Sequence, residues 1–141
     1  MVDPQPIWQP ISALPMLAEA IDGYIPASDD LYGSLLEARS KPHVMDDMTL
    51  DRVDKVYGRQ RDDMWLYDEQ LRRWSTETLR TDQVYEVARL QTVLDEVKAR
   101  IADILAIAAE LREGTIDRIM EKSDLELGLE VMLGARSSNR S

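Results

Sequence analysis

The sequence predicts an all-α, bundle-like protein built on a long antiparallel helical hairpin with short flanking helices. Two stretches carry apolar residues at alternating steps of three and four, which is the spacing of one helix face, and each stretch spans more than three heptads. No segment shows the two-residue alternation of a half-buried strand. The polar stretch between the two apolar seams is short, so the second helix is expected to fold back on the first.

The chain is expected to form one domain between two extended ends. Its 141 residues, 44% hydrophobic and 31% charged, suffice for a hydrophobic core and are too apolar for intrinsic disorder. Residues 1–10 contain three prolines and are predicted to be an extended N-terminal arm. We predict a single helical domain over 11–134 and a flexible tail over 135–141.

Two short helices are predicted ahead of the hairpin, at 12–22 and 28–40. Gly23 and Pro26 are expected to end the first, since glycine and proline are the residues that usually terminate helices. Ser28 is then the expected N-cap of the second.

The hairpin itself is predicted from helices at about 46–75 and 81–113. Each carries one seam of eight positions, and only one glutamine interrupts the apolar pattern among the sixteen. The first seam consists of Leu50, Val53, Tyr57, Gln60, Met64, Tyr67, Leu71 and Trp74. The second consists of Val87, Leu90, Leu94, Val97, Ile101, Ile104, Ala108 and Leu111.

Two more short helices are expected after the hairpin. Gly114 is the predicted stop of the second long helix, and Thr115 the start of the next one. Ser123 and Glu126 have the spacing of a capping box before a last helix, which Gly134 would end.

The stretch 104–109 is apolar on every side of a helix, so the hairpin partner alone cannot cover it. The candidates for covering it are the short helices before or after the hairpin, or a second copy of the chain. Two long helices with two apolar faces each favour a homodimer, the commonest way to bury such a surplus. The predicted interface residues are Val56, Trp65, Leu105, Ile107 and Ala109.

The charge distribution limits the partners that the chain can bind. The net charge is −10, and no segment is a basic block, so direct binding to nucleic acid or to an anionic membrane is not expected. The chain has no cysteine, no signal-like N-terminus and no apolar run of the roughly 20 residues that a bilayer requires. We expect a cytoplasmic protein, and its acidity favours a basic protein as partner.

One acidic cluster raises the question of a metal site. Asp47, Asp51 and Asp54 lie at i, i+4 and i+7, so their carboxylates share a helix face that could hold Mg²⁺. The alternative is that Asp46 or Asp47 caps the helix and the acidic residues complement its dipole. We favour the second interpretation and predict no cofactor.

A second acidic pattern suggests an alternative function. The pairs Glu110-x-x-Glu113 and Glu121-x-x-Asp124 resemble the paired acidic motifs of the all-α nucleotide pyrophosphatases. That resemblance implies Mg²⁺ held between two helices and a Mg²⁺-dependent hydrolase activity. The only histidine, His43, precedes the hairpin and is expected to be a loop residue, since a helix-bundle di-iron site needs a histidine from each of two helices.

The function predicted from these patterns is a non-catalytic helical interaction or regulatory protein, which acts through its own oligomer and through helix faces that bind partners. The alternatives are the Mg²⁺-dependent hydrolase and a structural or assembly component of a larger complex. Among single residues, Trp65 is the candidate anchor for a partner if it is exposed.

Overall fold

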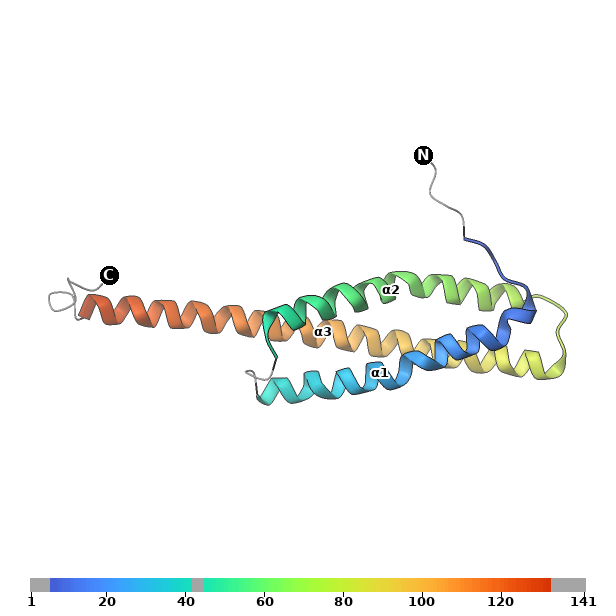
Figure 1. Ribbon diagram of the computed structural model, residues 1–141, viewed down its shortest axis with the longest axis horizontal. Helices are drawn as coiled ribbons and strands as arrows, with labels where there is room; N and C mark the ends of the chain where they lie inside the picture. The colour runs from blue at the N-terminus through green and yellow to red at the C-terminus, as the bar shows by residue number, and fades with distance from the viewer. Residues whose placement is uncertain (1–5, 42–44, 133–141) are drawn as a thin grey trace, which may run out of the picture.

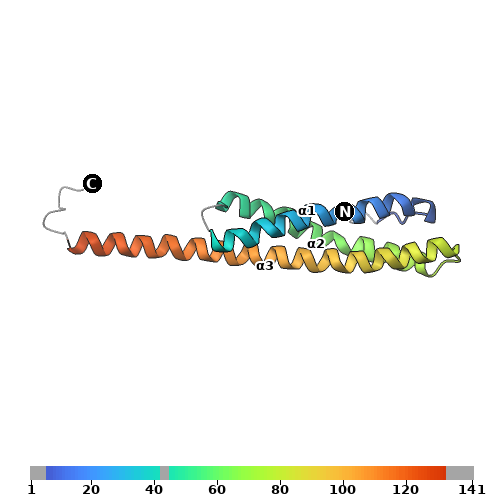
Figure 2. The same ribbon diagram turned by 90° about the horizontal axis from the view of Figure 1, so that it is seen from below.

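The computed structural model describes the backbone of residues 6–41 and 45–132, and the side chains up to residue 114. A short 3-10 turn, η1 (Ile11–Ala13), leads into three helices, α1 (Leu14–Ser40), α2 (Asp47–Ser75) and α3 (Thr81–Met132). The described residues contain no strand, so the predicted all-α, bundle-like class is confirmed. Figures 1 and 2 show an elongated molecule in which α1 and α2 both run along α3.

The antiparallel pair α2 and α3 is the predicted hairpin, with nearly the predicted bounds. Asp46 is the N-cap of α2, and its Oδ1 accepts a hydrogen bond from the Thr49 backbone N–H at 2.8 Å. At the other end, Thr76 and Glu77 donate backbone hydrogen bonds to the last carbonyls of α2. The chain then turns within a few residues, so α3 begins beside the end of α2.

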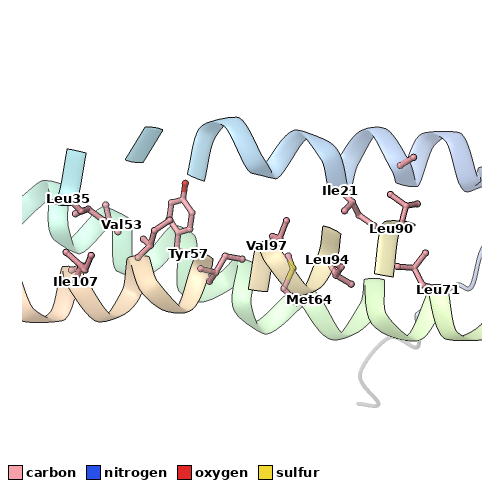
Figure 3. Close-up of a cluster of buried hydrophobic side chains, with 14 of the residues drawn as sticks. Ile21, Leu35, Val53, Tyr57, Met64, Leu71, Leu90, Leu94, Val97 and Ile107 are labelled. Atoms are coloured by element: carbon pink, nitrogen blue, oxygen red, sulfur yellow. The ribbon is translucent and has the colours of Figure 1, made fainter. Parts of the chain in front are cut away.

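The core follows the two predicted seams closely. All but one of the apolar seam positions of α2 are buried, and so are all but the last seam position of α3. Tyr67 and Leu111 are the half-buried exceptions. Figure 3 shows side chains from α1, α2 and α3 meeting between the helices; those labelled are Ile21, Leu35, Val53, Tyr57, Met64, Leu71, Leu90, Leu94, Val97 and Ile107.

The prediction of two short helices before the hairpin is wrong, because α1 is one helix of 27 residues. It continues through Gly23 and through Pro26, although a proline inside a helix removes one hydrogen bond and crowds the preceding turn. Ile21 and Leu35, on either side of the proline, are both fully buried. We attribute the continuity to this burial, since a break at Pro26 would withdraw one of them from the core.

Ser28 therefore caps nothing. Its side chain is 2% exposed inside α1, and its hydroxyl donates to the backbone carbonyls of Tyr24 and Ile25. This is how a serine in a helix interior satisfies a buried hydroxyl.

The prediction that Gly114 stops the second long helix is also wrong. Helix α3 has 52 residues and continues to Met132, so the two short helices expected at 115–133 are its last turns. Gly114 does not have the positive φ that a C′ glycine needs, since no glycine among the described residues has one. The expected tail at 135–141, the first five residues of the arm and His43 lie outside the described residues.

We expect Gly114→Ala to raise the free energy of unfolding by about 0.5–1 kcal/mol, the penalty for glycine in a helix interior. A Cβ at this position would meet no atom within 4 Å, so nothing opposes the gain. Urea unfolding followed by far-UV circular dichroism measures it. The reverse change Ala109→Gly, at an exposed position of the same helix, should lower stability by a similar amount. A loss of stability in Gly114→Ala would mean that α3 ends at this glycine.

The stretch of α3 that is apolar on every side is covered only in part, since Ile104, Ile107 and Ala108 are buried while Ala106 and Ala109 are exposed. The backbones of α1 and α2 each pack mainly along α3. Ion pairs hold each of them in register: Asp22, Asp29 and Arg39 of α1 pair with Arg89, Arg100 and Glu110 of α3, and Asp68 of α2 pairs with Lys98. These pairs are exposed, so they contribute less to stability than to the choice of register.

Within the described residues no helix is long and apolar enough to cross a membrane.

Candidate interaction surfaces

The described part of the predicted arm, residues 6–10, lies against the outer side of α2. Trp8 packs edge-on against Trp65, with ring centroids 6.3 Å apart and an interplanar angle of 75°. The guanidinium carbon of Arg73 lies 4.5 Å from the centroid of the Trp8 ring, which is a cation–π contact. Trp65 stays 54% exposed, so the two tryptophans form an aromatic surface rather than a core.

A glutamine clamp holds the arm in place. Gln70 is 5% exposed, and its Oε1 accepts a hydrogen bond from the Gln9 backbone N–H at 2.7 Å. Its Nε2 donates to the Gln9 carbonyl at 3.3 Å, and the indole N–H of Trp74 donates to the same carbonyl at 2.9 Å. The buried amide thus satisfies both backbone groups of Gln9, as a neighbouring strand would.

We expect Gln70→Ala to lower the free energy of unfolding by about 1–2 kcal/mol, because it leaves the Gln9 N–H without its partner. It should also release Trp8, which tryptophan fluorescence and its quenching by iodide will report. Gln60→Ala is the matched control: Gln60 is a half-buried glutamine on the same helix, and its side chain hydrogen-bonds to no described residue. Equal losses in the two variants would show that the arm is not clamped.

Two tyrosines bridge α1 and α2 beside the arm. The hydroxyls of Tyr24 and Tyr67 lie 3.2 Å apart, and their rings meet edge to face at 6.0 Å. They line a surface cavity of about 410 Å³, together with the arm residues Pro6, Ile7 and Trp8 and with Leu17, Asp63, Leu66 and Gln70. Burial is the main cause that raises the pKa of Tyr24 well above its ordinary value of 10, and the hydrogen bond to Tyr67 adds to it.

This raised pKa predicts a loss of stability in alkali. In the unfolded chain the Tyr24 phenol loses its proton near pH 10, whereas in the folded chain it keeps it. The contribution of this protonated phenol to the free energy of unfolding is therefore fully present below pH 10, and it is lost as the pH rises towards the folded-state pKa. We expect Tyr24→Phe to reduce the fall in Tm between about pH 9 and pH 11. Burial also raises the pKa of Tyr57, so part of the fall should remain. The control is Tyr85→Phe, at an exposed position; equal alkaline curves for all three proteins would contradict the prediction.

The five predicted interface residues do not form one surface. Val56 and Trp65 are 46% and 54% exposed on α2, and Ala109 is exposed on α3. Leu105 is half-buried and packs against the core. Ile107 is 6% exposed and lies inside the core, so the chain itself covers it.

The three aspartates considered as Mg²⁺ ligands are largely engaged elsewhere. Arg112 of α3 forms an ion pair with Asp51 at 2.6 Å and a second one with Asp54. Asp47 lies in the first turn of α2, where a negative charge complements the helix dipole. No group of three potential metal ligands occurs in the part of the chain that the structure describes.

The acidic pairs that resemble the nucleotide pyrophosphatase motif lie on one continuous helix. Since α3 does not break at Gly114, Glu110 and Glu121 are eleven residues apart along it, about 16 Å, and do not face each other across two helices. Glu110 forms an ion pair with Arg39, and Glu113 is exposed. The side chains of Glu121 and Asp124 lie outside the described residues.

The contact between Gln70 and the N-terminal arm could not be predicted from the sequence. Its only signal was an apolar pair, Ile7 and Trp8, inside a proline-rich arm, and a seam-adjacent glutamine at position 70. Its position on the helix predicts a surface residue for Gln70, so its hydrogen bonds to Gln9 can be identified only from the structure of the arm.

Comparison with known proteins finds no matching family model, no matching curated protein and no matching solved structure.

Proposed function

We propose that this chain is a non-catalytic helical interaction protein that pairs with a second copy of itself in the cytoplasm and presents helix faces to partners. The observation that carries the proposal is the far end of α3. Helices α1 and α2 flank α3 only up to about residue 112, and α3 runs on alone for residues 113–132 (Figures 1 and 2). These 20 residues span about 30 Å.

In proteins most of the stability of a helix comes from the tertiary packing of an apolar face and less from intrinsic propensity. The sequence of the free end is not that of an isolated solvated helix, since Ile116, Ile119, Leu125, Leu127 and Leu129 are all strongly apolar. Such a segment is stabilised by packing against another helix, as in a coiled coil. We therefore propose that a second copy supplies that helix.

A second surface is proposed for other partners. The exposed Trp65 and the half-buried Trp8, with the nearby Arg73, are residue types that are enriched at binding hot spots. The net charge of −10 favours a basic partner protein and faster association with it at low salt.

Breaking the free helix tests the pairing. We expect the full chain to elute as a dimer in size-exclusion chromatography with light scattering. Glu121→Pro, in the middle of the free end, should elute as a monomer, because proline interrupts the helix there. Glu121→Ala, which keeps the helix, should remain a dimer.

Near-UV circular dichroism will show whether the three-helix body is unchanged in both variants. A parent protein that is monomeric over the accessible concentration range would contradict the proposal. So would a Glu121→Pro variant that pairs as well as its parent.

A further inference from the structure

The first half of α2 carries a row of cations that form no ion pair with any residue whose side chain the structure describes. Met48, Arg52, Lys55 and Arg59 follow one another at steps of four, three and four, so they share one helix face, and Val56 lies at its edge. All five side chains are exposed. We call this set the basic face of α2.

Its cations are exceptional within this acidic protein. Every other lysine or arginine whose side chain is described forms an ion pair: Arg39, Lys41, Arg61, Arg72, Arg73, Arg80, Arg89, Lys98, Arg100 and Arg112. Arg52, Lys55 and Arg59 form none with the described residues. Of the carboxylates near them on α2, Asp51 and Asp54 are paired with Arg112 of α3. Asp46, the N-cap, has a Coulombic interaction with Arg52, and Asp63 lines a cavity together with Lys55 and Arg59.

The last turns of α3 have the opposite character. Residues 123–132 contain Asp124, Glu126 and Glu130 and no lysine or arginine. Leu125, Leu129 and Met132 recur at steps of four and three, so the same stretch carries an apolar face. We call residues 123–132 the acidic end of α3.

We propose that the acidic end of α3 from a second copy lies along the basic face of α2. Glu126 and Glu130, which are four residues apart and share one helix face, then meet Lys55 and Arg59, which form no ion pair with the described residues. The lengths also match, since ten residues of the acidic end and the twelve from Met48 to Arg59 span about 15 and 18 Å. Val56 is exposed beside the cations and offers an apolar contact to the incoming helix. A cavity of about 310 Å³ adds polar contacts; it is lined by Val56, Lys55, Arg59, Gln60 and Asp63.

The placement of the two elements suits a two-fold pair. The basic face lies where the free end of α3 leaves the three-helix body, because Asp51, in the first turns of α2, contacts Arg112 (Figure 1). Two copies with antiparallel free ends would each extend their acidic end towards the other's basic face. This is an isologous contact, in which each copy contributes both halves. The inference rests on the proposed homodimer and specifies how its copies meet.

A charge swap tests the contact in the full-length protein. We expect the pair Lys55→Glu and Arg59→Glu to weaken dimerisation about tenfold, as measured by sedimentation equilibrium in low salt. The pair Glu126→Lys and Glu130→Lys should weaken it similarly, and all four changes together should restore it. The control pair Arg61→Glu and Arg80→Glu makes the same charge change on cations outside the basic face and should leave the affinity unchanged.

Zero-length carbodiimide cross-linking of mixed ¹⁴N- and ¹⁵N-labelled chains gives a second measurement. The expected product joins Lys55 of one isotope to Glu126 or Glu130 of the other. A dimer that neither charge pair weakens, or that the four changes fail to restore, would overturn this inference and leave the proposed homodimer standing. A parent chain that is monomeric would overturn both.

Discussion

Trp74→Ala is expected to lower the free energy of unfolding by about 3–5 kcal/mol, the usual cost of deleting a large buried aromatic side chain. Trp74 is fully buried at the end of the α2 seam, and its indole N–H also donates to the Gln9 carbonyl. The variant therefore loses core packing and one of the contacts that hold the arm. Urea unfolding followed by far-UV circular dichroism measures the change.

Trp65→Ala is the matched control, since it deletes the same side chain from an exposed position nine residues earlier on the same helix. It should cost about 1 kcal/mol, most of it from the edge-on contact with Trp8. Similar losses in the two variants would mean that the α2–α3 seam is not the core of the protein.

Pro26→Ala is expected to have a large effect of the opposite sign. A proline in a helix interior costs about 3 kcal/mol relative to alanine, and its stiffening of the unfolded chain returns up to about 1 kcal/mol. Since α1 is helical on both sides of Pro26 and the residue is exposed, the substitution should raise the free energy of unfolding by about 2 kcal/mol.

The control for this prediction is Pro15→Ala. Pro15 is in the first turn of α1, where a proline interrupts no helical hydrogen bond, so its replacement should change stability little. If Pro26→Ala raises the free energy of unfolding no more than Pro15→Ala does, then α1 is broken at position 26 and the predicted pair of short helices is correct.

The hairpin could be predicted from the sequence because its signal is long and redundant. Fifteen of the sixteen seam positions are apolar or aromatic, so the single interruption at Gln60 does not hide the helical period. The turn and the Asp46 cap are local signals that rest on neighbouring residues, and these too correspond to the structure.

The helix boundaries at Gly23, Pro26 and Gly114 could not be predicted in this way. Each of these residues disfavours a helix locally, by about 1 kcal/mol for glycine and 3 kcal/mol for proline. In α1 that cost is offset by burial of Ile21 and Leu35 against α3, which is a tertiary effect and leaves no trace in a short window. The helices before the hairpin were among the candidates to cover the stretch 104–109, and in the structure Ile107 lies in the core of the chain itself.

The exposure of some candidate surface residues could be predicted from the sequence, and their contacts could not. The exposure of Val56 and Trp65 agrees with their position off the seam, which is a matter of helical period. The clamp of Gln70 on Gln9 joins residues 61 positions apart, and no periodicity indicates such a pair. The ion pairs of Arg112 with Asp51 and Asp54 also join two helices, and helical period does not indicate them.

The measurement that tests the central claim most directly is hydrogen exchange of the backbone amides of residues 113–132 as a function of protein concentration. If a second copy covers the free end of α3, these amides should be protected at high concentration and should lose protection together on dilution, while the amides around Leu94 stay protected throughout. Fast exchange of the free end at every concentration would contradict the claim, and so would protection that is independent of dilution in a chain of monomeric mass.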